Sequence, residues 1–131
     1  MAQQAGTRNR PLSPHLQIWR WGPGMVSSIL HRVTGVGASV GLLLLMWWLG
    51  ALVAGPAAYA QFVDLVDSPI GIIVLVGVSW SVIGHAITGI RHFVLDTGAG
   101  YELEQNKLWA NVSTAAGFVL TALFWAVLLL R

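Results

Sequence analysis

The sequence predicts an all-α membrane protein with three transmembrane helices, and two observations carry that prediction. Of the 131 residues, 56% are hydrophobic, whereas only seven are Lys or Arg and five are Asp or Glu. Soluble domains carry about 25% charged residues, and a chain this short has too little interior to hide so much apolar surface from water. Three stretches without charge, 33–63, 68–90 and 108–130, each exceed the roughly 20 residues that cross a bilayer.

The first transmembrane helix is expected at about 25–54. Its charge-free stretch is longer than one span, but Gly55 and Pro56 interrupt it. Proline disfavours helix in the residue before it and removes a backbone hydrogen bond, so the helix should end there. Residues 59–67 are then expected to form a short loop.

The second transmembrane helix is expected at 69–96. Asp67 and Ser68 are both good N-cap residues, and Pro69 suits a first turn, where no amide partner is needed. The helix should end at about residue 96, because glycines follow at 98 and 100.

The third transmembrane helix is expected at 107–130, with Asn106 as its N-cap. Ser113, Gly117 and Thr121 are spaced four residues apart and form a seam of small residues along this helix. Such seams let helix backbones approach closely in a membrane, so we expect helix packing rather than chemistry here.

The basic residues predict the orientation of the chain. A three-helix topology places most of them on one side of the membrane: Arg8, Arg10, Arg20, Arg32, Arg91 and Lys107. The other side has Arg131 with Asp64 and Asp67. The positive-inside rule then places the N-terminus and the second connection in the cytoplasm.

The composition also limits the class of protein. The chain has no cysteine, which excludes disulfide scaffolds and cysteine-ligated zinc or iron–sulfur clusters within it. Its net charge of +2 is too small, and its basic residues are too scattered, for nucleic acid to be an expected partner. We expect one domain, 1–131, with an arm at 1–24 that is neither a secretory signal nor a transit peptide.

His85 is the deepest titratable residue of the predicted spans, and such groups usually mark a pathway, a cofactor or a partner. Ser81, Thr88 and His92 share its helical stripe, and Gly89 lies one turn after it. A neutral imidazole is a good ligand for haem iron, and the glycine leaves room for a flat macrocycle. The residues equally allow that His85 only hydrogen-bonds a neighbouring helix. We also expect Ser81 to accept the second imidazole N–H.

A second polar group, formed by Ser28, His31 and Arg32, lies at the start of the first helix. Ser28 and Arg32 are one turn apart, which places a hydroxyl and a guanidinium together at the membrane edge. This group suits a quinone carbonyl or a carboxylate such as a haem propionate. Alternatively, the arginine extends to the interface and the serine caps the helix. His85 and His92 map to the same leaflet, so one cofactor between the first two helices would be within reach of both groups.

Three segments together resemble a known family: RPLSPHL at 10–16, SSILHRVTG at 27–35 and HAITGIRHFVLD at 85–96. Their order, and their places relative to the three spans, are similar to those of the large cytochrome b subunit of succinate dehydrogenase, respiratory complex II. The resemblance implies half of a heterodimeric haem-binding helix bundle. It also implies pairing with a second small three-helix anchor subunit and docking of the iron–sulfur and flavoprotein subunits.

The resemblance implies how haem b is held. His85 would be an axial ligand of its iron, and the other ligand would come from the partner anchor subunit. His31 and Arg32 would lie at a haem propionate and His92 near the haem edge, while Gly89 is the residue that we expect to pack against the macrocycle.

The resemblance also implies that Ser28, Ile29 and Arg32 form part of a ubiquinone site. The chain would have no catalytic residue of its own and would act within a bacterial inner membrane, in the tricarboxylic acid cycle and aerobic electron transport. Two alternatives remain in view. One is a haem-free membrane anchor, and the other is a small proton-pathway protein in which Ser81, His85 and Thr88 form a relay.

Overall fold

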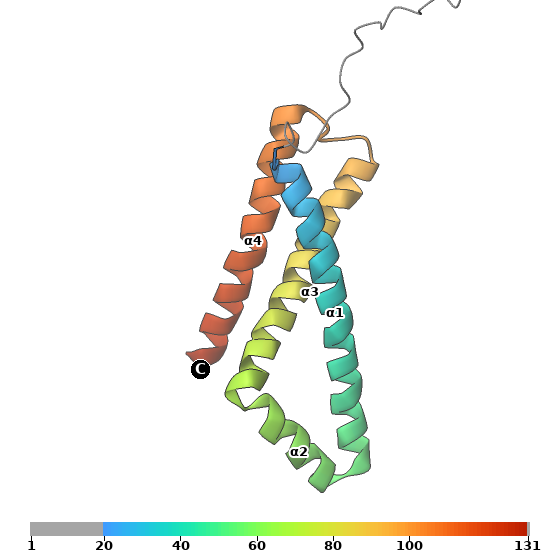
Figure 1. The fold of residues 1–131 in the computed structure, drawn as a ribbon, viewed down its shortest axis with the longest axis vertical. Helices are drawn as coiled ribbons and strands as arrows, with labels where there is room; N and C mark the ends of the chain where they lie inside the picture. The colour runs from blue at the N-terminus through green and yellow to red at the C-terminus, as the bar shows by residue number, and fades with distance from the viewer. Residues whose placement is uncertain (1–19, 131) are drawn as a thin grey trace, which may run out of the picture.

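A computed structural model describes residues 20–130 of the chain. Within them the fold consists of helices alone, confirming the predicted all-α class (Figure 1). The helices are α1 (Pro23–Ala54), α2 (Pro56–Val66), α3 (Pro69–Asp96) and α4 (Leu103–Leu129). Three of these, α1, α3 and α4, are long and apolar enough to cross a membrane. The sequence segment at 10–16 and the charges of Arg8, Arg10 and Arg131 lie outside the described residues.

Helix α2 occupies a segment in which we expected a loop, so that prediction was wrong. Gly55 ends α1 with a positive φ of 107°, a conformation that favours glycine. Pro56 then stands in the first turn of α2, because the residue that stops one helix is well suited to begin the next. Phe62 is buried and packs edge-on against Trp47 of α1, with ring centroids 5.2 Å apart. This contact holds α2 across the end of the bundle.

The start of α3 agrees with the sequence prediction. Ser68 is the N-cap and accepts a hydrogen bond from the Gly71 amide at 3.1 Å, and Pro69 stands in the first turn. The helix ends at Asp96, and the connection that follows contains Gly98 and Gly100, both with positive φ.

Helix α4 begins earlier than predicted, and its predicted cap was wrong. The N-cap is Glu102, and Asn106 lies inside the first turns of the helix. The Asn106 side chain accepts a hydrogen bond from the Arg91 guanidinium of α3 at 2.5 Å. Asp96, five residues after Arg91 on the same helix, does not pair with it.

Small residues set the crossing of α3 and α4. A Cβ atom placed on Gly117 would lie 3.1 Å from the Cα of Gly84, so the two backbones are in contact there. Ser113 and Thr121, one turn to either side, are buried and donate their hydroxyl protons to carbonyls of their own helix. The predicted packing seam is confirmed, because its glycine contacts α3 and its two hydroxyls hydrogen-bond to carbonyls of α4 itself.

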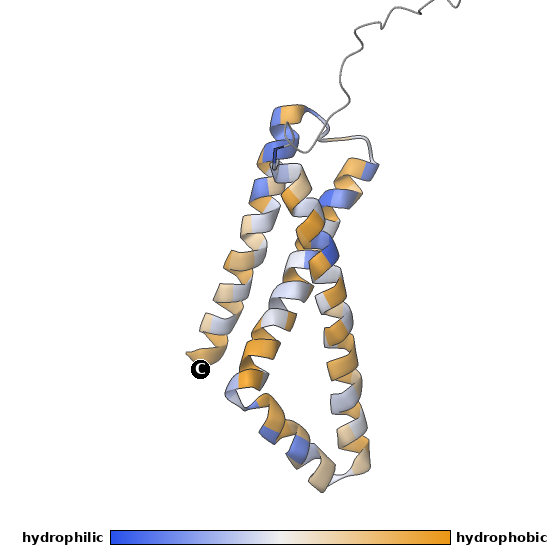
Figure 2. Ribbon diagram, viewed as in Figure 1, coloured by the Kyte–Doolittle hydropathy of each residue, from blue (hydrophilic) through white to orange (hydrophobic). Residues whose placement is uncertain are grey.

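Glycines also bring α1 against α3. A Cβ atom on Gly37 would overlap the Ser81 hydroxyl, and one on Gly41 would overlap Val78. The two long helices therefore pack closely near the middle of their lengths, with their remaining faces apolar and exposed (Figure 2). Hydrophilic residues gather where α1 begins, α3 ends and α4 begins. We call this the arginine end, after Arg20, Arg32 and Arg91.

Candidate functional site: an imidazole cluster between α1 and α3

Three imidazoles meet between α1 and α3, toward the arginine end. The rings of His31 and His85 stack with centroids 4.0 Å apart and planes 7° apart. The ring of His92, two turns after His85 on α3, lies 4.7 Å from His31 and is tilted by 50°. The fold thus brings together residues of the two polar groups that the sequence singled out.

The His85 ring is oriented by the backbone of the neighbouring helix. Its Nδ1 atom lies 3.0 Å from the carbonyl oxygen of His31. A carbonyl can only accept, so Nδ1 carries the proton and donates it, and Nε2 keeps its lone pair. This is the arrangement that metal-binding histidines typically show. Our expectation that Ser81 accepts this N–H was wrong, because Ser81 is packed against Gly37 instead.

The His31 ring is oriented by α3 in return. Its Nδ1 atom lies 2.7 Å from the Thr88 hydroxyl oxygen. Thr88 is buried, and its single proton is donated to the carbonyl of Gly84 at 2.7 Å. The Thr88 oxygen therefore accepts from His31 Nδ1, which leaves the Nε2 lone pair of this ring free as well. Each helix thus fixes an imidazole of the other.

Glycines create the space for the stacked rings. A Cβ atom on Gly35 would lie 3.0 Å from Cε1 and 3.3 Å from Nδ1 of His85, closer than side chains normally approach. Gly35 therefore lets the imidazole lie against α1. Gly35 was not among the site residues singled out from the sequence. Gly89, which we expected to make room beside His85, faces His31 with ordinary contact at 3.8 Å.

The residues predicted for a quinone site lie on the outer side of α1. Arg32 is exposed, Ile29 is 38% exposed and Ser28 is half-buried. Within residues 20–130, neither the Ser28 hydroxyl nor the Arg32 guanidinium makes a hydrogen bond or an ion pair. The fold therefore leaves their donors available next to the imidazole cluster.

Fold and site together define a class: a small multi-pass membrane protein with an ordered cluster of imidazoles between two of its helices. Ionisable side chains at this depth are rare because burying them in hydrocarbon is costly, and they generally serve a function. Among the described residues, no three His, Asp or Glu side chains are grouped to hold a metal ion by themselves. A metal-containing group at this cluster would need a further ligand.

Comparisons with known proteins identify the family. The family model of the succinate dehydrogenase/fumarate reductase transmembrane subunit matches residues 6–124. The chain is 40% identical to the succinate dehydrogenase cytochrome b556 subunit of Paracoccus denitrificans over 115 residues, 88% of each chain. It is 35% identical to the subunit of the same name in Rickettsia felis over 116 residues, 88% of this chain and 90% of the relative.

A mitochondrial relative is also similar. The succinate dehydrogenase cytochrome b560 subunit of Sus scrofa is 37% identical over 102 residues, which cover 74% of this chain and 59% of the relative. The chain belongs to the succinate dehydrogenase/fumarate reductase transmembrane subunit family. The resemblance stated from the three sequence segments is thereby confirmed.

Proposed function

We propose that the chain is a haem b-binding membrane-anchor subunit of succinate:ubiquinone oxidoreductase, with His85 as an axial ligand of the haem iron. The hydrogen bond from His85 Nδ1 to the His31 carbonyl carries this proposal. It fixes the tautomer and the plane of the ring and leaves Nε2 available for iron. The cytochrome b names of the relatives support a haem in this protein.

The stacking of the two rings bears on the second axial ligand. Axial ligands occupy opposite sides of the iron, but His31 and His85 lie face to face at 4.0 Å and nearly parallel. Two rings stacked in this way could not hold one iron between them, so His31 would not be the second ligand. We propose that a second small three-helix anchor subunit supplies that ligand. Haem b held by His85 and a ligand from that subunit would supply one-electron transfer.

The other imidazoles and Arg32 serve the periphery of the haem in this proposal. The exposed Arg32 guanidinium suits a propionate, to which a planar fork of N–H donors is well matched. His31 would donate to the same propionate only with Nε2 protonated, because its Nδ1–H is already given to Thr88. His92 borders the same group of rings and would lie near the haem edge. Gly89 keeps the surface of α3 flat beside His31, where the macrocycle can pack.

We place part of the ubiquinone site on the outer face of α1. Ser28 and Arg32 have unused donors that can hydrogen-bond a quinone carbonyl, and the exposed Ile29 offers an apolar contact to the ring. Reduction of a quinone takes two electrons and two protons, and this chain alone cannot supply or enclose them. The site is therefore completed by the partner anchor and the iron–sulfur subunit, and the chain is not catalytic by itself.

We propose that the arginine end faces the cytoplasm of a bacterial cell, with the chain in the inner membrane. The positive-inside rule supports this orientation. The imidazole cluster and the proposed quinone residues lie toward the same end, which is where the iron–sulfur and flavoprotein subunits would dock. Electrons leaving an iron–sulfur cluster would then cross only part of one leaflet.

The optical spectrum of the purified complex tests the proposal. We expect b-type bands in the reduced-minus-oxidised spectrum, in the amount of one haem per copy of this chain. A haem-free anchor has no such bands, and a proton-pathway protein has conductance without visible absorbance. Absence of the bands from an intact, freshly purified complex would refute haem binding.

Gly35→Val is expected to lower haem affinity by about tenfold, the effect typical of losing a residue that orients a metal ligand. The added side chain would occupy the space of the His85 ring, whose Cε1 is 3.0 Å from the position of a Cβ atom. Gly50→Val is the matched control, because no atom lies within 4 Å of a Cβ there on the same helix. Haem content and midpoint potential measure the effect. Equal values in the two variants would contradict the role of Gly35.

A further inference from the structure

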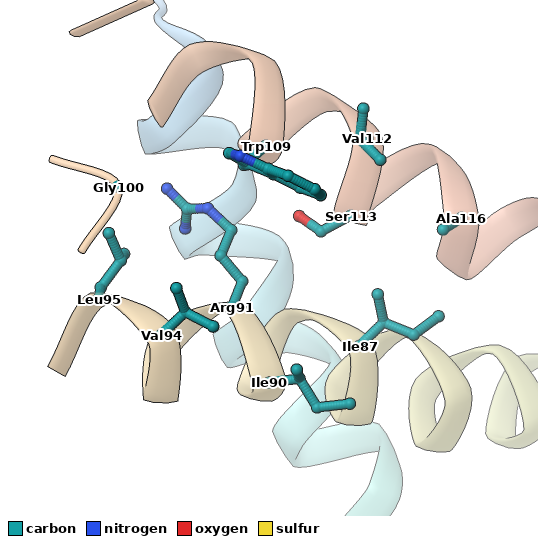
Figure 3. A pocket seen from close by; sticks show the side chains of 10 residues that line it. All are labelled: Ile87, Ile90, Arg91, Val94, Leu95, Gly100, Trp109, Val112, Ser113 and Ala116. Carbon is teal, nitrogen blue, oxygen red and sulfur yellow. The ribbon is translucent and has the colours of Figure 1, made fainter. Parts of the chain in front are cut away.

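A cavity lies between α3 and α4 at the arginine end (Figure 3). The two helices touch at Gly84 and Gly117 and separate from there, and the cavity of about 260 Å³ fills the space between them. Most of its lining is aliphatic: Ile87, Ile90, Val94 and Leu95 from α3, and Val112 and Ala116 from α4. The proposed haem and quinone residues are not among those that line it.

One cation lines this apolar cavity. Figure 3 shows the Arg91 side chain rising from α3 toward α4, with its guanidinium beside Trp109 and near Gly100. One of its N–H groups donates to the neutral side-chain oxygen of Asn106. A guanidinium has five N–H donors, so most of this fork has no acceptor within residues 20–130.

The other charged groups at this end do not neutralise Arg91. Lys107 and Glu104 pair with each other at 2.8 Å, and Asp96 and Glu102 are exposed. In the described part of the chain, no carboxylate lies within ion-pair distance of the Arg91 guanidinium. The cation at the cavity therefore has a neutral hydrogen-bond partner but no counter-charge.

The cavity lies near the level of the lipid headgroups and is open toward the hydrocarbon. Helix α3 ends five residues beyond Arg91, about 7.5 Å along the axis, so the guanidinium lies near the level of lipid headgroups. Trp109 lies beside it, and tryptophan is enriched at that level. Ile90 is 63% exposed and Val94 49%, so the cavity is bordered by surface that faces the hydrocarbon.

We propose that this cavity binds an anionic phospholipid, with an acyl chain between α3 and α4 and the phosphate against Arg91. The aliphatic lining suits the chain, and an uncompensated cation at headgroup depth suits the phosphate. Basic pockets between transmembrane helices are typical sites for anionic lipid headgroups. A zwitterionic lipid gains less here, because its own cation competes for the phosphate. The proposal depends on the membrane location of the chain and not on its haem.

Lipid binding to the intact purified complex tests this site. The complex is delipidated in detergent and titrated with phosphatidylglycerol or with phosphatidylcholine of the same chains, and the retained lipid is counted by native mass spectrometry. We expect about tenfold tighter binding of phosphatidylglycerol, and one fewer retained molecule per chain in Arg91→Gln. Lys107→Gln, which removes a cation of the same end outside the cavity lining, should retain it.

Two further variants separate the headgroup from the acyl chain. Arg91→Lys keeps the positive charge and should keep most of the preference for phosphatidylglycerol. Ala116→Phe fills the apolar part of the cavity and should weaken binding of both lipids. If Arg91→Gln does not assemble, these two variants still test whether the cavity binds an anionic phospholipid.

Three results would overturn the proposal. The first is equal retention of phosphatidylglycerol by the wild type and Arg91→Gln, or by the wild type and Ala116→Phe. The second is equal affinity for phosphatidylcholine, which would show an apolar groove without headgroup recognition. The third is displacement of the bound lipid by millimolar inorganic phosphate, which would assign Arg91 to a free anion.

Discussion

Replacement of His85 by alanine in the assembled complex is expected to remove the b-type absorbance bands. The variant loses the Nε2 lone pair that the hydrogen bond to the His31 carbonyl holds in place. His31 is not expected to take over, because its ring is stacked parallel to that of His85 and faces it. We expect haem content to fall by at least about tenfold, as losses of ligands or of their supporting groups generally cause.

Ser81→Ala is the matched control for this experiment. Ser81 lies one turn before His85 on the same helix, but its hydroxyl packs against Gly37 and does not orient the imidazole. The b-type bands of the Ser81→Ala complex should therefore keep their amplitude and position. Free imidazole added to His85→Gly should restore part of the absorbance, which separates loss of a ligand from loss of the fold. Unchanged bands in His85→Ala would show that iron is held elsewhere.

Arg32→Leu is expected to lower succinate-driven quinone reduction by about tenfold to a hundredfold. That is the loss expected when a charged hydrogen bond to a developing negative oxygen is removed, about 1.5–3 kcal/mol. Succinate oxidation with an artificial electron acceptor should change little, because electrons then leave the complex before they reach the membrane. The two assays on one preparation measure the difference.

Two variants show whether charge or geometry is responsible. Arg32→Lys keeps the charge but loses the planar fork, so its rate should lie between those of the wild type and Arg32→Leu. Lys107→Leu removes a cation of the same end that pairs with Glu104, and both of its assays should stay near the wild-type values. If Arg32→Leu lost both activities equally, its effect would be on assembly and a local role at the quinone would be excluded.

The transmembrane helices were predictable because a membrane imposes simple requirements. Charged residues are excluded from the hydrocarbon, so the three charge-free stretches are visible in the sequence. The start of α3 is marked locally by Ser68 and Pro69. Helix α2 was missed for a physical reason. Gly55 and Pro56 signal an interruption, but whether the chain then forms a loop or a new helix depends on burial of Phe62 against Trp47, a contact between distant residues.

The three imidazoles of the candidate site were predictable, but their hydrogen bonds were not. His31, His85 and His92 stand out because imidazoles are rare in membrane helices. Their partners do not stand out, because the acceptor for His85 is a backbone carbonyl, which every residue has. Asp96 is close to Arg91 in sequence, but a separation of five residues on a helix turns it to a different side. Asn106 comes instead from α4, across the helix pair.

The hydrogen bond between His85 and the carbonyl of residue 31 also determines which substitutions preserve the orientation of the His85 ring. A side-chain acceptor is lost by one substitution, but a main-chain carbonyl is kept by any residue that leaves the helix intact. The orientation of His85 is therefore insulated from change at position 31. The constraint moves to Gly35, where even a methyl group would meet the imidazole ring. For the orientation of His85 alone, variation is thus tolerated in the residue that supplies the acceptor and restricted in the one that supplies the space.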